Sequence, residues 1–213
     1  FAMVVVGGVT RLTRSGLSIV EWQPLMGAIP PLTESHWQEL FAKYQRTPEY
    51  LRVNHDMALH EFKGIFWWEY IHRLLGRLIG LAFFVPLVWF LIRGQIERAL
   101  LPRLLAIFLL GGLQGAVGWW MVKSGLIDDP RVSHVSWSIH LGIACVILGA
   151  MLWTALGLLS GERVTDPDRR RLARYGAGLS ALIFLMVLSG ALVAGTRAGF
   201  AYNTFPLMNG YIV

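Results

Sequence analysis

A carboxylate and an imidazole lie three residues apart at the start of a long apolar run. Glu69 and His72 would share one face of a helix, because residues three apart are neighbours on a helix surface. Gly76 and Gly80 continue this face and leave it flat. Ionisable groups inside a membrane span are costly and usually face the interior of a helical bundle. We therefore predict a site here, provided that another part of the chain supplies a partner for His72.

His140 is the partner that we predict. Like His72, it lies near the outer end of an apolar run, so the two imidazoles would reach a similar depth. One imidazole from each of two helices is a haem ligand set, so one interpretation is that His72 and His140 bind haem iron. The alternative is that His72 only forms a hydrogen bond with Glu69 or a neighbouring backbone carbonyl, and His140 only one with a partner on another helix. The residues alone leave both interpretations open. Zinc is less favoured, because it prefers three or four ligands and no third histidine or cysteine is close.

Glu69 and Arg77 each have two interpretations. Glu69 would either form an ion pair with Arg73, one helical turn further on, or serve the reaction as a base or a stabiliser of positive charge. Arg77 lies inside the apolar run and cannot face lipid cheaply. It would bind either a carboxylate of the ligand or a backbone carbonyl, and the sequence does not decide.

The composition is that of a membrane protein. The 213 residues are 55% hydrophobic and 15% charged, with a mean hydropathy of +0.53, which is too apolar for a soluble domain of this size. A span needs ~20 apolar residues, and four runs are long enough: 74–92, 100–122, 139–159 and 175–194. Residues 1–9 resemble the last turns of a further span, and no initiator methionine or signal peptide precedes them. We predict an all-α membrane protein whose sequence here begins inside a helix.

Loop charges predict the orientation of the spans. Arginines are concentrated around 93–103 and 163–174, and these short loops should face the cytoplasm or its equivalent. The long segment 10–66 would then lie outside. Within it, Thr33 reads as the N-cap of an amphipathic helix, whose apolar stripe would be Trp37, Leu40, Phe41 and Tyr44. The mixed charges of this segment argue against nucleic acid as a partner.

A weak internal repeat predicts the domain organisation. Gly8 precedes Pro24-Leu25-Met26 by the same spacing as Gly190 precedes Pro206-Leu207-Met208. Repeats of whole helical units are common in membrane proteins, and here the unit would be a bundle of four transmembrane helices. The predicted division is the end of helix 1 (1–9), the outer segment (10–66), helices 2 to 4 (67–172), the first helix of a second half (173–196) and an outer loop (197–213). The protein would continue with further spans.

Several motifs together resemble the haem A synthase family. They are Gly7-Gly8-Val9-Thr10-Arg11-Leu12-Thr13, Trp68-Glu69-Tyr70 with His72-Arg73, Leu113-Gln114-Gly115, His140-Leu141-Gly142 and the run from Ala198 to Met208. The resemblance extends along the whole chain. The long outer segment contains no cysteine, and in this it resembles the proteobacterial and mitochondrial kind (type 2).

This resemblance implies an oxidoreductase that converts the C8 methyl of haem O to a formyl group, with oxygen from water, making haem A for cytochrome oxidase. Glu69 would be catalytic, His72 and His140 would bind the iron of haem O, and Arg73 and Arg77 would belong to the same binding site. A haem b would occupy the second half. The membrane would be the bacterial inner membrane or the mitochondrial inner membrane.

The expected partners and the rival functions complete the prediction. Lipid, haem O and haem A are the expected partners, haem O synthase is suggested by the family alone, and a homo-oligomer is left open. The alternative function is a b-type membrane cytochrome that carries electrons without modifying haem. A transporter with a midplane site fits poorly, because the polar groups lie near one face of the membrane.

Overall fold

The computed structural model describes residues 1–23, 26–127, 130, 132–160, 167–196, 198–201, 204 and 207–212. Within them, the elements in chain order are α1 (Ala2–Leu12), the 3₁₀ helix η1 (Met26–Ala28), α2 (Glu34–Tyr44), α3 (Pro48–Arg52), α4 (Leu59–Ile92), α5 (Leu101–Gly125), α6 (His134–Ser160), α7 (Pro167–Thr196) and α8 (Ala198–Ala201). The predicted all-α fold is confirmed. The chain divides into two compact units, Phe1–Val132 and Ser133–Val213.

Four of the described helices are long and apolar enough to cross a membrane: α4, α5, α6 and α7. They contain the four apolar runs that the sequence predicts as spans, except for Leu100, which immediately precedes α5. Pro86 lies inside α4, which continues through it. Proline is tolerated in membrane helices, because neighbouring groups satisfy the backbone carbonyl that it leaves free. The chain is a multi-pass membrane protein.

Helix α4 begins at Leu59, well before its apolar run. At its start, the backbone N–H of Ala58 donates a 2.8 Å hydrogen bond to Glu61 Oε2, which caps the first turn. The first turns bury Phe62 and Phe66 against other aromatic side chains. The end of the predicted outer segment 10–66 is therefore helical and continuous with the membrane helix.

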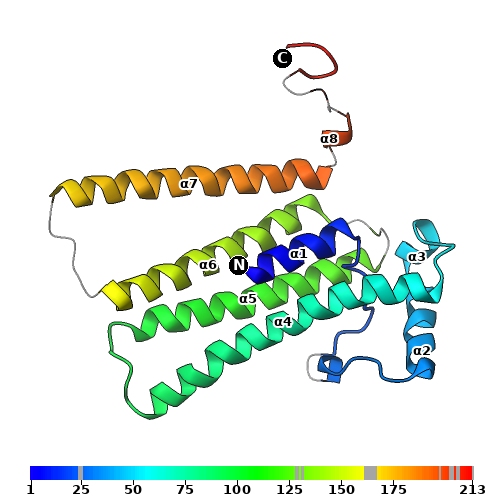
Figure 1. Cartoon of the computed structure of the whole chain (residues 1–213), viewed down its shortest axis with the longest axis horizontal. Coiled ribbons are helices and arrows are strands. Elements are labelled where there is room, and N and C mark those ends of the chain that lie inside the picture. Colours follow the sequence, from blue (N-terminus) through cyan, green and yellow to red (C-terminus); the bar gives the residue numbers. More distant parts are fainter. Residues whose placement is uncertain are drawn as a thin grey trace. The chain divides into compact units, whose positions relative to one another are not determined.

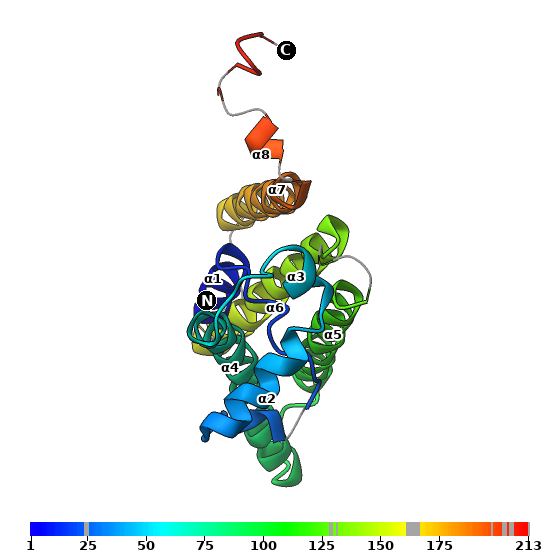
Figure 2. The same ribbon diagram turned by 90° about the vertical axis from the view of Figure 1, so that its right-hand side faces the viewer.

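The connection between α1 and α4 is a packed structure with its own core. The side chain of Thr33 accepts a 3.3 Å hydrogen bond from His36 N–H, so the predicted N-cap of α2 is confirmed. Trp37 and Tyr44 are buried, and the Trp37 ring lies 4.9 Å from that of Phe66 in an edge-to-face contact. Figures 1 and 2 show α2 and α3 gathered at the N-terminal end of α4.

Helix α1 packs against α4 in the opposite direction (Figure 1). Thr10 Oγ1 donates a 3.4 Å hydrogen bond to the carbonyl of Trp68. Two turns towards the start of α1, a side chain on Gly76 would meet Met3 Cε at 3.3 Å. Met3 therefore covers Gly76, which belongs to the flat face that the sequence predicts one turn after His72.

In the second unit, α6 and α7 pack along each other (Figure 1). Glycines allow this close approach: a side chain on Gly142 would lie 3.0 Å from Leu188 Cδ2, and one on Gly195 would overlap with His134. Several residues used in the sequence predictions lie outside the described residues, namely Arg163 in the basic loop and Pro24, Leu25 and Pro206 of the repeat. The orientation in the membrane and the repeat stay predictions.

Candidate functional site

The centre of the candidate site is a buried ion pair on α4. Glu69 is 2% exposed, and its Oε1 lies 2.6 Å from Nη2 of Arg73, one helical turn further on. This is one of the two interpretations of Glu69 that the sequence leaves open. The pair is far more enclosed than Lys63–Glu34 on the surface, whose side chains are 32% and 61% exposed. A buried pair of this kind fixes both side chains, because either charge alone would be costly to bury.

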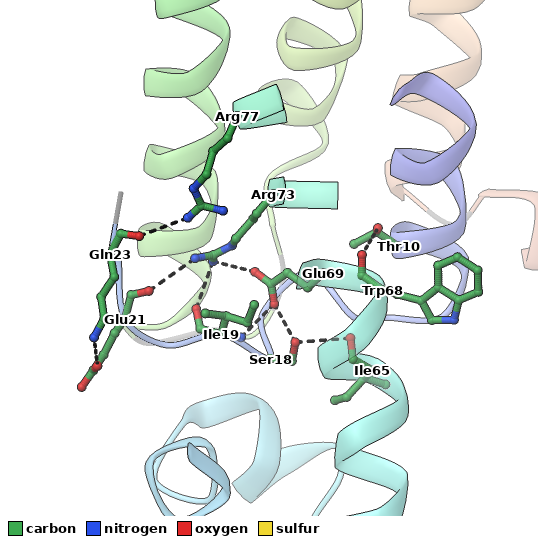
Figure 3. A network of polar contacts seen from close by, with 10 residues as sticks. All are labelled: Thr10, Ser18, Ile19, Glu21, Gln23, Ile65, Trp68, Glu69, Arg73 and Arg77. Carbon is green, nitrogen blue, oxygen red and sulfur yellow. Dashed lines mark hydrogen bonds and ion pairs between the residues drawn. The ribbon is translucent and has the colours of Figure 1, made fainter. Parts of the chain in front are cut away.

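The second oxygen of Glu69 binds the connection between α1 and α4. Ser18 Oγ donates a 2.7 Å hydrogen bond to Oε2, and the backbone N–H of Ile19 donates one of 2.8 Å to the same atom. With Arg73, three donors thus converge on one carboxylate (Figure 3). Both carboxylate oxygens of Glu69 are therefore bound, which fixes the orientation of the side chain.

The arginines of the site bind backbone carbonyls. Arg73 Nη2 donates to the carbonyl of Ile19 at 3.0 Å, and Arg77 Nη2 donates to that of Gln23 at 3.1 Å. The backbone carbonyl that the sequence leaves open as one partner of Arg77 is therefore present. Residues 18–23 run along α4 turn by turn, from Glu69 to Arg77 (Figure 3). The sequence gives no sign of this contact, because it joins residues about fifty positions apart.

His72 lies on α4 between these arginines and α1. Its ring is half-buried and is packed against Gly7, where a side chain would come within 3.2 Å of His72 Nε2. In the part of the chain that the structure describes, no hydrogen bond to the His72 ring is present. Both oxygens of Glu69 are bound elsewhere, so the alternative in which Glu69 binds His72 is not the one observed. An imidazole kept out of such bonds fits a role as a haem ligand.

His140 lies in α6, in the second unit, and is half-buried. His72 belongs to the unit Phe1–Val132 and His140 to the unit Ser133–Val213. The pairing of the two imidazoles on one iron stays a prediction.

A second buried carboxyl lies outside the predicted site. Glu49 is 6% exposed at the start of α3, behind Tyr44, which is fully buried and whose hydroxyl accepts a 2.7 Å hydrogen bond from Asn54 Nδ2. Burial raises the pKa of Glu49 to about 7, and the negative charge of Glu69 adds to the rise, while the Tyr44 hydroxyl and Arg14 oppose it. The run Thr47-Pro48-Glu49 is a typical helix start, which predicts α3 but not the burial of the acid.

The fold and site define a class of protein. It is a helical membrane protein in which the folded connection between α1 and α4 is bound to α4, beside His72, whose ring makes no hydrogen bond within the described residues. Sequence comparison is more specific, since the family profile described as cytochrome oxidase assembly protein (COX15-CtaA) matches residues 1–213. The chain belongs to this family.

Individual relatives agree with this assignment. The chain is 60% identical over its whole length to a "Heme A synthase" from Nitrosospira multiformis, and 57% identical to one from Parvibaculum lavamentivorans. A "Heme A synthase" from Nitrosomonas eutropha is 56% identical. The chain spans about 60% of the length of these relatives, namely 60%, 61% and 61%. No solved structure matches the chain.

Proposed function

We propose that the protein is a haem A synthase, which oxidises the C8 methyl of haem O to a formyl group in the inner membrane of a bacterium. The observation that carries the proposal is the buried Glu69 carboxylate next to a histidine whose ring makes no hydrogen bond within the described residues. The names of the relatives support a synthase over an electron-carrying cytochrome.

His72 and His140 would hold the iron of haem O. The support on this chain is the surroundings of His72, where the ring faces a glycine and Glu69 is bound by other donors. Haem b would belong to the second half of the protein. When bound, the iron porphyrin supplies the redox chemistry, and the protein's part is to position it and to shape the electric field around it.

Glu69 is proposed to act as a fixed negative charge. Oxidising a methyl group with water as the oxygen donor removes electrons and protons, so positive charge develops at the carbon that reacts. Arg73, Ser18 and the N–H of Ile19 occupy both oxygens of this carboxylate, so a group that reacted with it would have to displace one of these donors. The same donors hold it in one orientation, and such preorganised charge stabilises a developing cation without rearrangement.

Arg73 and Arg77 are proposed to position the site rather than to react. Each binds the backbone of residues 19–23, which fixes this segment of the connection beside α4. Arg73 would also hold Glu69 in place.

The test is a pigment analysis of the protein expressed with haem O. Haems are extracted from the purified wild type and from Glu69→Gln and identified by mass. We expect haem A from the wild type, and haem O or its alcohol from the variant. Glu39→Gln is the matched control, because Glu39 lies on the exposed side of α2 and pairs only with Lys43 among the described residues; it should yield haem A.

Two results would contradict the proposal. Haem b alone in the wild type and in both variants would indicate an electron carrier. Haem A in normal yield from Glu69→Gln would be consistent with the enzyme activity but would contradict the catalytic role of Glu69. Glu69 would then be only the structural partner of Arg73.

A further inference from the structure

Two adjacent glycines of α1 differ in what they face. A side chain on Gly7 would place its Cβ 3.2 Å from Nε2 and 3.7 Å from Cδ2 of His72. A side chain on Gly8 would meet no atom within 4 Å in the described structure. Gly7 and Gly8 lie in the middle of the same helix, so they share helix propensity and depth but not surroundings.

The contact at Gly7 is fixed by the pairing of the two helices. On one side of it, Thr10 Oγ1 binds the carbonyl of Trp68, and on the other Met3 fills the space above Gly76. These contacts bracket His72 and set which residue of α1 lies opposite its ring. A shift of the helix to avoid a new side chain at position 7 would disturb both of them.

The atom that a side chain at position 7 would contact, Nε2 of His72, can bind a metal. Nε2 is one of the two nitrogens by which an imidazole ligates a metal. The structure shows no hydrogen bond to the His72 ring within the described residues, so no such bond competes with a metal for Nε2. A methyl carbon 3.2 Å from Nε2 would be closer than ordinary van der Waals contact, so it would press on the ring or take space that a ligand of this nitrogen needs.

We propose that Gly7 is a positioning residue for haem: the absence of a side chain keeps Nε2 of His72 accessible to the iron. The inference rests on the proposed function, because it needs His72 to be a haem ligand. The inference also specifies where the porphyrin would bind: on the face of α4 that borders α1.

The test is a binding titration with ferric protoporphyrin IX on the detergent-purified protein. Gly7→Ala, Gly8→Ala, His72→Ala and the double variant G7A/H72A are compared with the wild type by absorbance and by the low-spin signal in electron paramagnetic resonance. The share of binding that depends on His72 is the difference between wild type and His72→Ala, which removes any contribution from another haem site.

We expect Gly7→Ala to weaken the share that depends on His72 by about tenfold or more, as for other groups that orient a metal ligand. Gly8→Ala should bind as the wild type does. In the double variant, the added methyl should have no further effect on binding. If Gly7→Ala also lowers the melting temperature, G7A/H72A should melt as His72→Ala does, because the side chain that the methyl presses on has been removed.

The outcomes separate the two proposals. Equal binding by wild type and Gly7→Ala, with loss in His72→Ala, would overturn the role of Gly7 and leave the haem site intact. A double variant that melts as low as Gly7→Ala would also overturn it, since the methyl would then act on other atoms of α4. Unchanged binding by His72→Ala would remove the haem ligand itself and with it the basis of the proposed function.

Discussion

Ser18 Oγ donates a 2.7 Å hydrogen bond to Oε2 of Glu69, and so joins the segment that follows α1 to the most buried acid of the membrane helices described. Ser18 is 2% exposed. Its hydroxyl therefore has no access to water as an alternative partner, and neither has the carboxylate atom that it binds.

Replacing Ser18 by Ala should destabilise the protein. The carboxylate loses one of its donors while staying buried, and a hydrogen bond to a charged group is worth about 1.5–3 kcal/mol. Thermal unfolding in detergent, followed by circular dichroism, measures the change. Ser35→Ala is the control, because Ser35 is exposed on α2 and bonds only to the exposed Thr33 hydroxyl among the described residues. A melting temperature for Ser18→Ala equal to that of the control would show that the bond does not stabilise the fold.

Removing the guanidinium of Arg73 should cost more. Arg73→Leu leaves Glu69 buried without its counter-charge, and breaking a buried pair in this way typically costs about 3–5 kcal/mol. The double variant R73L/E69Q should be more stable than Arg73→Leu alone, because no uncompensated charge remains. Lys63→Gln, which breaks the exposed pair with Glu34, should change stability by less than about 1 kcal/mol. Equal losses in Arg73→Leu and Lys63→Gln would contradict the burial argument.

Glu49 should make stability depend on pH. Its pKa of about 7 in the folded protein lies above the ordinary value of 4.5, so the folded state holds a proton that the unfolded state releases between these values. Its contribution is therefore fully present below about pH 4.5 and is lost as pH rises through 7. At 1.36 kcal/mol per pKa unit, the whole effect is about 3 kcal/mol.

Glu49→Gln should remove this dependence. The variant should be more stable than the wild type at pH 8, because the amide carries no charge to bury, and the difference should disappear below about pH 4.5. Melting temperatures across this range measure it, with Glu39→Gln as the control, since Glu39 is exposed and paired with Lys43. A difference between wild type and Glu49→Gln that is constant with pH would show that Glu49 does not titrate there.

The sequence predicts the membrane helices well, because long apolar runs have few other uses in a chain of this composition. It also predicts the N-cap at Thr33 and the apolar face of α2, since these are local patterns. It does not predict that α4 begins at Leu59. The added turns are amphipathic and stabilised by aromatic packing on α2, and hydropathy alone does not report such contacts.

The candidate site is predicted in part. The spacing of Glu69 and Arg73 indicates their ion pair, because residues four apart meet on a helix. The bonds from Ser18, Ile19 and Gln23 are long-range and depend on how the connection folds back, which no local pattern encodes. The role proposed for Gly7 likewise depends on its contact with His72 on another helix, which the sequence does not predict. The pairing of His72 with His140 stays a prediction.

The contacts that join residues 18–23 to Glu69, Arg73 and Arg77 have a consequence for biogenesis. Both partners are encoded before α5, so a nascent chain can form these bonds as soon as α4 has entered the membrane. Units of a growing chain generally fold in order of synthesis. A substitution at Ser18 or Arg73 would then act during translation, by delaying the closure of α1 onto α4, and would expose a charged α4 to the insertion machinery and to membrane proteases.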